Sequence, residues 1–112
     1  KLRNKYMKRV FNTDLSTCRQ GQTIYGFYHC SDKIEKCSKN GDMYLDVLLS
    51  DQASSLYAKV WNHVDYFNSK FKTGVDVAVK GKVVKYRNRF EINILNINTS
   101  SKTLYSKYGF KK

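Results

Sequence analysis

The side chains most able to do chemistry lie between residues 42 and 62, where rings and charges alternate with aliphatic residues. Successive side chains of a β-strand point to opposite faces, so this alternation divides them into two sets. The set expected to face a core is Leu45, Val47, Leu49, Leu56, Ala58 and Val60. The set expected to face outward is Tyr44, Asp46, Leu48, Tyr57, Lys59 and Trp61. Exposed rings can stack on nucleobases and a lysine can contact phosphate, so the outward set is a candidate binding surface for nucleic acid.

Each ring on this surface also has a purely structural interpretation. Tyr44 and Tyr57 could form a cross-strand pair that only covers the sheet. Trp61 could instead close one end of the fold against a helix. The strands expected at 44–49 and 56–61 are joined by a polar turn in which Asp51 is the expected cap, so all three rings belong to one hairpin.

Elements on both sides of the hairpin must position it. Residues 23–30 are rich in β-branched and aromatic side chains and predict a strand. Residues 31–40 are polar and lysine-rich, and they are expected to form a continuation of this strand and a loop. Residues 63–71 repeat apolar side chains at intervals of three and four, which predicts a short helix with Asn62 as its N-cap.

The second half of the chain returns to strand patterning. Residues 75–86 and 90–98 alternate and are separated by a short turn at 87–89, and Phe90, Ile92 and Ile94 are expected on one face of the last strand. Gly26 and Gly81 lie inside predicted strands, where a glycine favours a bulge or a tight bend.

This order of elements predicts an all-β fold: a five-stranded Greek-key OB-fold barrel with one short helix between strands 3 and 4. An SH3-like barrel has no helix at that place, and a sandwich would need more strands. The expected organisation is a basic N-terminal arm over 1–20, an OB-fold domain over 21–98 and a basic C-terminal tail over 99–112.

OB folds hold single strands on their second and third strands, between the loop after the first strand and the loop after the fourth. The first loop here is expected to offer Lys33, Lys36 and Lys39. The predicted nucleic-acid-binding residues are Tyr44, Tyr57, Lys59, Trp61, Lys36, Lys39, Lys85, Tyr86, Arg87 and Arg89.

The chain is strongly basic, and its positive charge is unevenly distributed along the sequence. The net charge is +12, with nine Lys/Arg against one acid in 80–112 and six against one in 1–20, whereas 21–79 holds six against seven. A polyanion is the natural partner of such flanks, although a basic surface can also serve solubility or bind an acidic protein.

Other classes of function find little support. Three cysteines at unrelated spacings, without Cys-x-x-Cys, predict free thiols in an intracellular setting, either in the cytoplasm or on the nucleoid. No metal site and no cofactor are expected, because His29 and His63 do not stand at ligand spacings with the cysteines. No apolar run reaches membrane-spanning length, no signal peptide is expected, and no catalytic Ser/His/Asp or Cys/His spacing occurs.

The stretches 21–28, 41–51, 56–62, 77–83 and 86–92 together resemble nucleic-acid-binding OB domains of the tRNA-anticodon-binding type. Within that group the sequence is most similar to the OB domain that precedes an HD domain in YhaM-like 3′–5′ exoribonucleases. The resemblance implies a substrate-binding role, because the HD domain carries the metals and the chemistry in those proteins.

The sequence therefore leads to one main hypothesis and one alternative. The main hypothesis is non-catalytic binding of single-stranded RNA or DNA, with bases stacked on the aromatic hairpin and phosphates held by basic loops. Such a domain could present a strand to a nuclease domain. The alternative is a protein-interaction OB module that docks an acidic partner.

Overall fold

The computed structural model describes residues 13–100, which form five strands and two short helices. The strands are β1 (Thr23–Cys37), β2 (Met43–Ser50), β3 (Ser55–Val60), β4 (Asp76–Tyr86) and β5 (Arg89–Thr99). A 3-10 helix, η2 (Leu15–Thr17), precedes β1, and α1 (Val64–Asn68) lies between β3 and β4. None of the helices in the described part of the chain is long and apolar enough to cross a membrane.

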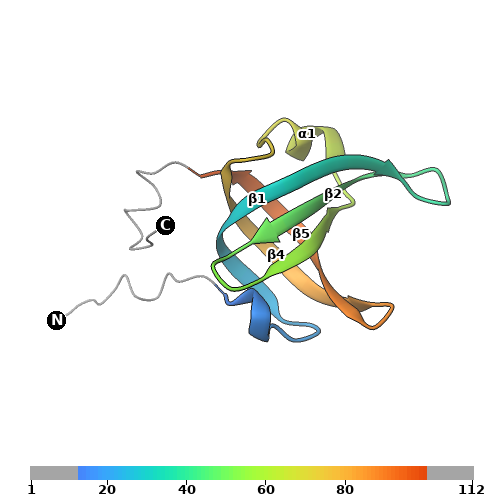
Figure 1. The fold of residues 1–112 in the computed structure, drawn as a ribbon. Coiled ribbons are helices and arrows are strands. Elements are labelled where there is room, and N and C mark those ends of the chain that lie inside the picture. Colours follow the sequence, from blue (N-terminus) through green and yellow to red (C-terminus); the bar gives the residue numbers. More distant parts are fainter. Residues whose placement is uncertain (1–12, 101–112) are drawn as a thin grey trace.

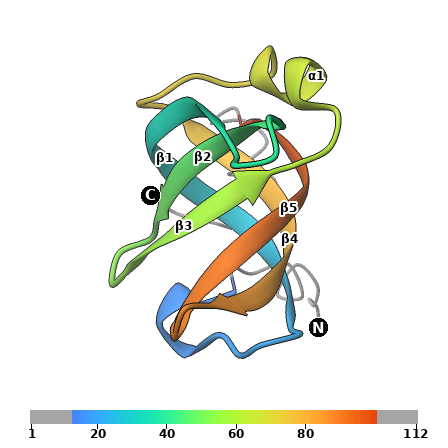
Figure 2. The ribbon, with the colours of Figure 1, turned by 90° about the vertical axis from the view of Figure 1, so that its right-hand side faces the viewer.

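The strands close into one barrel in the order β1-β2-β3-β5-β4, and β4 returns to pair with β1 (Figure 1). The β3–β5 pair is parallel and every other pair is antiparallel. Helix α1 lies at one end of the barrel and η2 at the other (Figure 2). The predicted five-stranded OB-fold barrel with one helix between strands 3 and 4 is confirmed.

The barrel interior is filled by the aliphatic side chains predicted to face inward. Leu45, Val47, Leu49, Ala58 and Val60 have no exposed surface, and Leu56 packs against them while partly buried. Burying one such large aliphatic side chain stabilises the fold by roughly 1.5–3 kcal/mol. The alternation of the hairpin is therefore fixed by the core, and its other face must point outward.

Two irregularities let the sheet curl. The β4–β5 register shifts between Lys80 and Gly81, so the predicted irregularity at Gly81 is confirmed. A Cβ at Gly81 would lie 2.5 Å from Ile92 Cγ2, which explains why this position carries no side chain. The pairing of β1 with β4 continues without a shift through Gly26, and the irregularity of β1 lies instead at Ser31, where its register with β2 shifts.

Helix α1 is shorter than predicted. Its N-cap is His63, in a left-handed conformation with φ of 53°, so the prediction of Asn62 as N-cap is wrong. The Lys33 ammonium of β1 donates to the carbonyls of Asn68 and Phe71, at 3.1 and 2.6 Å, which satisfies them where the helix has ended. The chain then turns Phe71 into the core, where it is 3% exposed.

Two other boundaries also differ from expectation. Strand β1 continues to Cys37, so Lys33 and Lys36 lie on a strand and not in the first loop. At the far end, Arg87 and Asn88 both have positive φ and form a two-residue hairpin turn, which places Arg89 on β5. Phe90 follows on β5 and is 37% exposed, whereas Ile92 and Ile94, expected on the same face of the strand, are buried.

Residues 13–20 of the expected N-terminal arm lie at the end of the barrel opposite α1 (Figure 2). Leu15 is buried, and its amide donates to Asp51 Oδ2 at 3.0 Å. Asp51 Oδ1 accepts from the amides of Ala53 and Ser54, so its predicted role as the cap of the β2–β3 turn is confirmed. Residues 1–12 of the expected arm and 101–112 of the expected tail lie outside the described residues.

Candidate nucleic-acid interface

Cross-strand register arranges the outward side chains of β1, β2 and β3 in rows. Asp46, near the middle of β2, stands opposite Ile34 on β1 and Lys59 on β3. In a neighbouring row, Leu48 stands opposite Tyr57. The outward set predicted from alternation thus forms one continuous surface, and a Tyr44–Tyr57 cross-strand pair is excluded by this register.

The remaining rings meet in the next row. Tyr44 stands opposite Lys36, and its ring stacks on Trp61 with centroids 4.4 Å apart and planes inclined by 26°. Trp61 follows directly after β3 and is 42% exposed. The two rings form a small aromatic platform on the outward face, and Tyr44 holds Trp61 in place.

A hollow of about 270 Å³ opens on this face. That volume is near the lower limit of small-ligand pockets. Tyr57 stands at its wall with 46% of its surface exposed, and no other ring in residues 13–100 stacks on it. The hollow is lined by Asp32, Ile34, Lys36, Asp46, Leu48, Tyr57, Lys59, Arg89 and Glu91.

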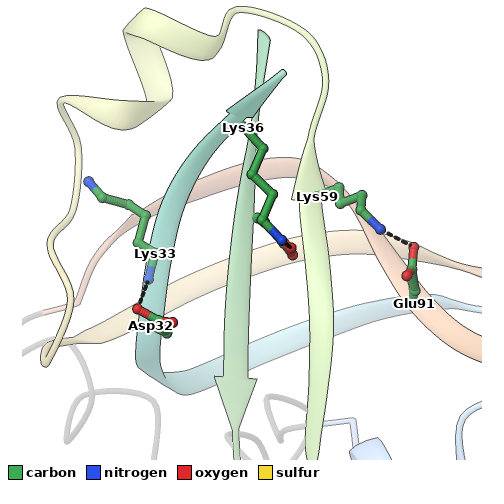
Figure 3. A network of polar contacts seen from close by, with 6 residues as sticks. Asp32, Lys33, Lys36, Lys59 and Glu91 are labelled. Atoms are coloured by element: carbon green, nitrogen blue, oxygen red, sulfur yellow. Dashed lines mark hydrogen bonds and ion pairs between the residues drawn. The ribbon is translucent and has the colours of Figure 1, made fainter. Parts of the chain in front are cut away.

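The charges of the hollow balance, because its three carboxylates face three cations. Lys36 Nζ lies 2.7 Å from Asp46 Oδ2, and Lys59 Nζ lies 2.7 Å from Glu91 Oε1 (Figure 3). The hydrogen bond and charge of Asp46 raise the pKa of Lys36. Two of the four lysines predicted to bind nucleic acid, Lys36 and Lys59, are therefore already paired with carboxylates of the protein.

The rim of the hollow on the β4–β5 side is built around Tyr86, which is half exposed. Arg87 lies 5.2 Å from the centre of its ring and Lys59 lies 5.4 Å from it, both within the range of cation–π attraction. The two-residue turn fixes Arg87 next to this ring. Lys59 of β3 therefore contacts Tyr86 at the end of β4, which joins the β4–β5 hairpin to the outward face.

The structure brings most of the predicted residues together. Lys36, Tyr57, Lys59 and Arg89 line the hollow, while the Tyr44–Trp61 platform and the Tyr86 rim adjoin it. Lys39 and Lys85 are exposed but do not line it. Lys33 is committed to the carbonyls after α1, so its expected place in a ligand-binding loop is wrong.

Three carboxylates of the hollow, Asp32, Asp46 and Glu91, were not predicted as site residues. The signal for Asp46 was present, since alternation places it on the face of Tyr44 and Lys59. No local pattern places Glu91 there, because β5 meets β3 through a parallel pairing of strands distant in sequence, Ala58 with Ile92 and Lys59 with Asn93.

Two buried cysteines lie outside the hollow. Cys18 and Cys30 are buried, and burial raises the pKa of each thiol, which keeps them protonated near neutral pH. No group of three or more His, Cys, Asp or Glu side chains within 13–100 is placed to hold a metal ion.

Comparison with known proteins agrees with this geometry. The family model of the OB-fold nucleic acid binding domain, of the tRNA anticodon type, matches residues 30–99. The chain belongs to this family. The predicted resemblance to YhaM-like proteins is also confirmed: the chain is 24% identical over 83 residues to the 3′–5′ exoribonuclease YhaM of Shouchella clausii. That match covers 74% of this chain, which spans about a quarter of the relative's length (26%).

Solved OB-fold structures superpose on this chain. The second OB-fold domain of replication protein A from Methanococcus maripaludis has a TM-score of 0.63 at 22% identity, covering 82% of this chain and 97% of that one. A mitochondrial single-stranded DNA binding protein from S. cerevisiae has a TM-score of 0.59 at 17% identity, covering 72% and 95%. At these identities the likeness establishes the shared fold.

Proposed function

We propose that this domain binds single-stranded nucleic acid, RNA or DNA, on the outward face of β1, β2 and β3, and that it catalyses no reaction itself. The observation that carries the proposal is the hollow beside two exposed rings, Tyr57 and Trp61. Stacking one base on an aromatic side chain contributes about 1–3 kcal/mol and does not depend on sequence.

The charge distribution supports a division between bases and phosphates. The hollow has no excess of positive charge, since Lys36 and Lys59 are each paired with a carboxylate. A phosphate in it would gain little, whereas a stacked base needs no charge. Lys39, Lys85 and Arg87 are exposed and do not line the hollow, and we propose them as the phosphate contacts.

The relatives give this binding a context. One is named a 3′–5′ exoribonuclease and another a single-stranded DNA binding protein. Within a longer protein, this domain would hold a strand for a catalytic domain. An intracellular setting and a catalytic or protein partner stay predictions from the sequence.

Fluorescence anisotropy with labelled oligo-U and oligo-dT, each at two salt concentrations, tests the proposal. We expect saturable binding to both that weakens as salt rises and strengthens with oligomer length up to the site size. No binding to either oligomer at low salt would contradict it. Binding to an acidic protein without any dependence on oligonucleotide length would instead support the protein-docking alternative.

A further inference from the structure

One atom of the hollow lacks a partner. Asp46 Oδ1 has almost no accessible surface, and no group in residues 13–100 donates a hydrogen bond to it. The whole side chain is only 11% exposed. Buried carboxylate oxygens are nearly always hydrogen-bonded, so an unpaired one calls for a physical explanation.

The neighbours of Asp46 indicate which group of a bound ligand could donate a hydrogen bond to its Oδ1. It lies in the row between those of the Tyr44–Trp61 platform and Tyr57, so a base stacked on either ring would bring its edge near this carboxylate. Lys59, its cross-strand neighbour, donates instead to Glu91. The protein thus leaves one acceptor unused at the centre of its aromatic face.

We propose that Asp46 selects bases that carry an exocyclic amino group, so that cytosine is bound more tightly than uracil or thymine. This inference rests on the proposed function, because it needs a base on that face. A carboxylate accepts a hydrogen bond from the amino group of cytosine, as aspartate and glutamate do in base recognition. Uracil presents carbonyl oxygens on both sides of its single N–H, and these repel a carboxylate.

Asp46 Oδ1 is buried, so a base can reach it only when a neighbouring side chain moves. Lys36 is the neighbour with the most freedom to move. Its side chain is 45% exposed, and its ammonium is held by Asp46 Oδ2 from the adjacent strand. Once a strand is bound, this exposed side chain can turn toward solvent. The base amino group then takes its place beside the carboxylate.

Oligo-C and oligo-U of equal length provide the test, because the two pyrimidines offer rings of the same size for stacking. Titration of the whole chain should give an affinity for oligo-C that is roughly 5- to 100-fold higher. An oligomer of N4,N4-dimethylcytidine, which has no amino hydrogen, should bind no better than oligo-U. This comparison needs no altered protein and so does not depend on the folding of a variant.

Asp46→Asn should reduce the ratio of the two affinities to near one, because the amide can donate to the uracil carbonyl. Asp42→Asn removes the same charge from an exposed residue between β1 and β2 that does not line the hollow, and it should keep the ratio. Equal affinities of the unaltered chain for oligo-C and oligo-U, or an unchanged ratio in Asp46→Asn, would overturn the inference. Absence of binding to every oligomer would refute the proposed function itself.

Discussion

Asp46 and Lys59 stand directly opposite each other on β2 and β3, yet each is paired with a different residue. Lys59 reaches across to Glu91 on β5, and Asp46 accepts from Lys36 on β1. One ion pair therefore links β1 to β2, and the other links β3 to β5, across the outward face. They also leave the hollow between them without net charge, which favours bases over phosphates there.

Removal of the exposed ring at the wall of the hollow should weaken binding without unfolding the barrel. In Tyr57→Ala we expect the affinity for oligonucleotides to fall roughly 5- to 100-fold, because one stacked base contributes about 1–3 kcal/mol. Anisotropy titration measures the affinity, and circular dichroism checks the fold. Tyr25→Ala is the matched control, since Tyr25 is 54% exposed but lies beside β4, outside the hollow, and its loss should leave binding unchanged.

Arg87 should contribute to the salt dependence of binding. Each phosphate contact on a single strand contributes about 0.7 to the slope of log affinity against log salt. Arg87→Gln should lower that slope by roughly this amount, as measured by titrations over a series of salt concentrations. Lys72→Gln makes the same change of charge after α1, and an equal loss of slope there would show that only the net charge matters.

The Lys59–Glu91 ion pair should contribute to the stability of the barrel. Both side chains are mostly buried, at 15% and 12% exposed. Lys59→Met leaves the Glu91 carboxylate without its cation, and the free energy of unfolding should fall by about 3 kcal/mol in urea titrations. Lys59→Met combined with Glu91→Leu should recover most of that loss. If the double variant were as unstable as the single one, the burial of an unpaired charge would not be the cause.

Gly81 should tolerate no side chain. In Gly81→Ala the new Cβ would lie 2.5 Å from Ile92 Cγ2 and 2.9 Å from the carbonyl oxygen of Asn93, so β4 and β5 would have to separate. We expect a loss of about 1–3 kcal/mol in thermal or urea unfolding. In Gly41→Ala the Cβ meets no atom within 4 Å, and only the strain of a left-handed residue, about 1 kcal/mol, is expected. Equal losses in the two variants would argue against steric overlap at the bulge.

The barrel could be predicted because its signals are local. The alternation of Leu45, Val47 and Leu49 with Tyr44 and Asp46 determined both faces of β2, and the glycine at 81 marked an irregularity. The limits of α1 were harder to foresee. They depend on Lys33, a residue distant in the sequence whose ammonium takes the carbonyls of Asn68 and Phe71.

The site was predictable in its rings but not in its charges. Tyr57 and Trp61 follow from the alternation of the hairpin, whereas the pairing of Lys36 with Asp46 depends on the register of β1 against β2. That register includes a shift at Ser31, which no pattern in the sequence predicts. A sequence can list the cations of a face, but their partners are decided by which strands become neighbours.

The emission of Trp61 tests the central claim most directly. It is the sole tryptophan of the chain, and its ring lies on the platform with Tyr44 where a base is expected to stack. Titration with a single-stranded oligomer at low salt should quench this emission saturably, with the same midpoint as anisotropy. The matching duplex should quench it far less. Anisotropy that reports tight binding while the emission of Trp61 stays constant would contradict the claim that the strand lies on this face.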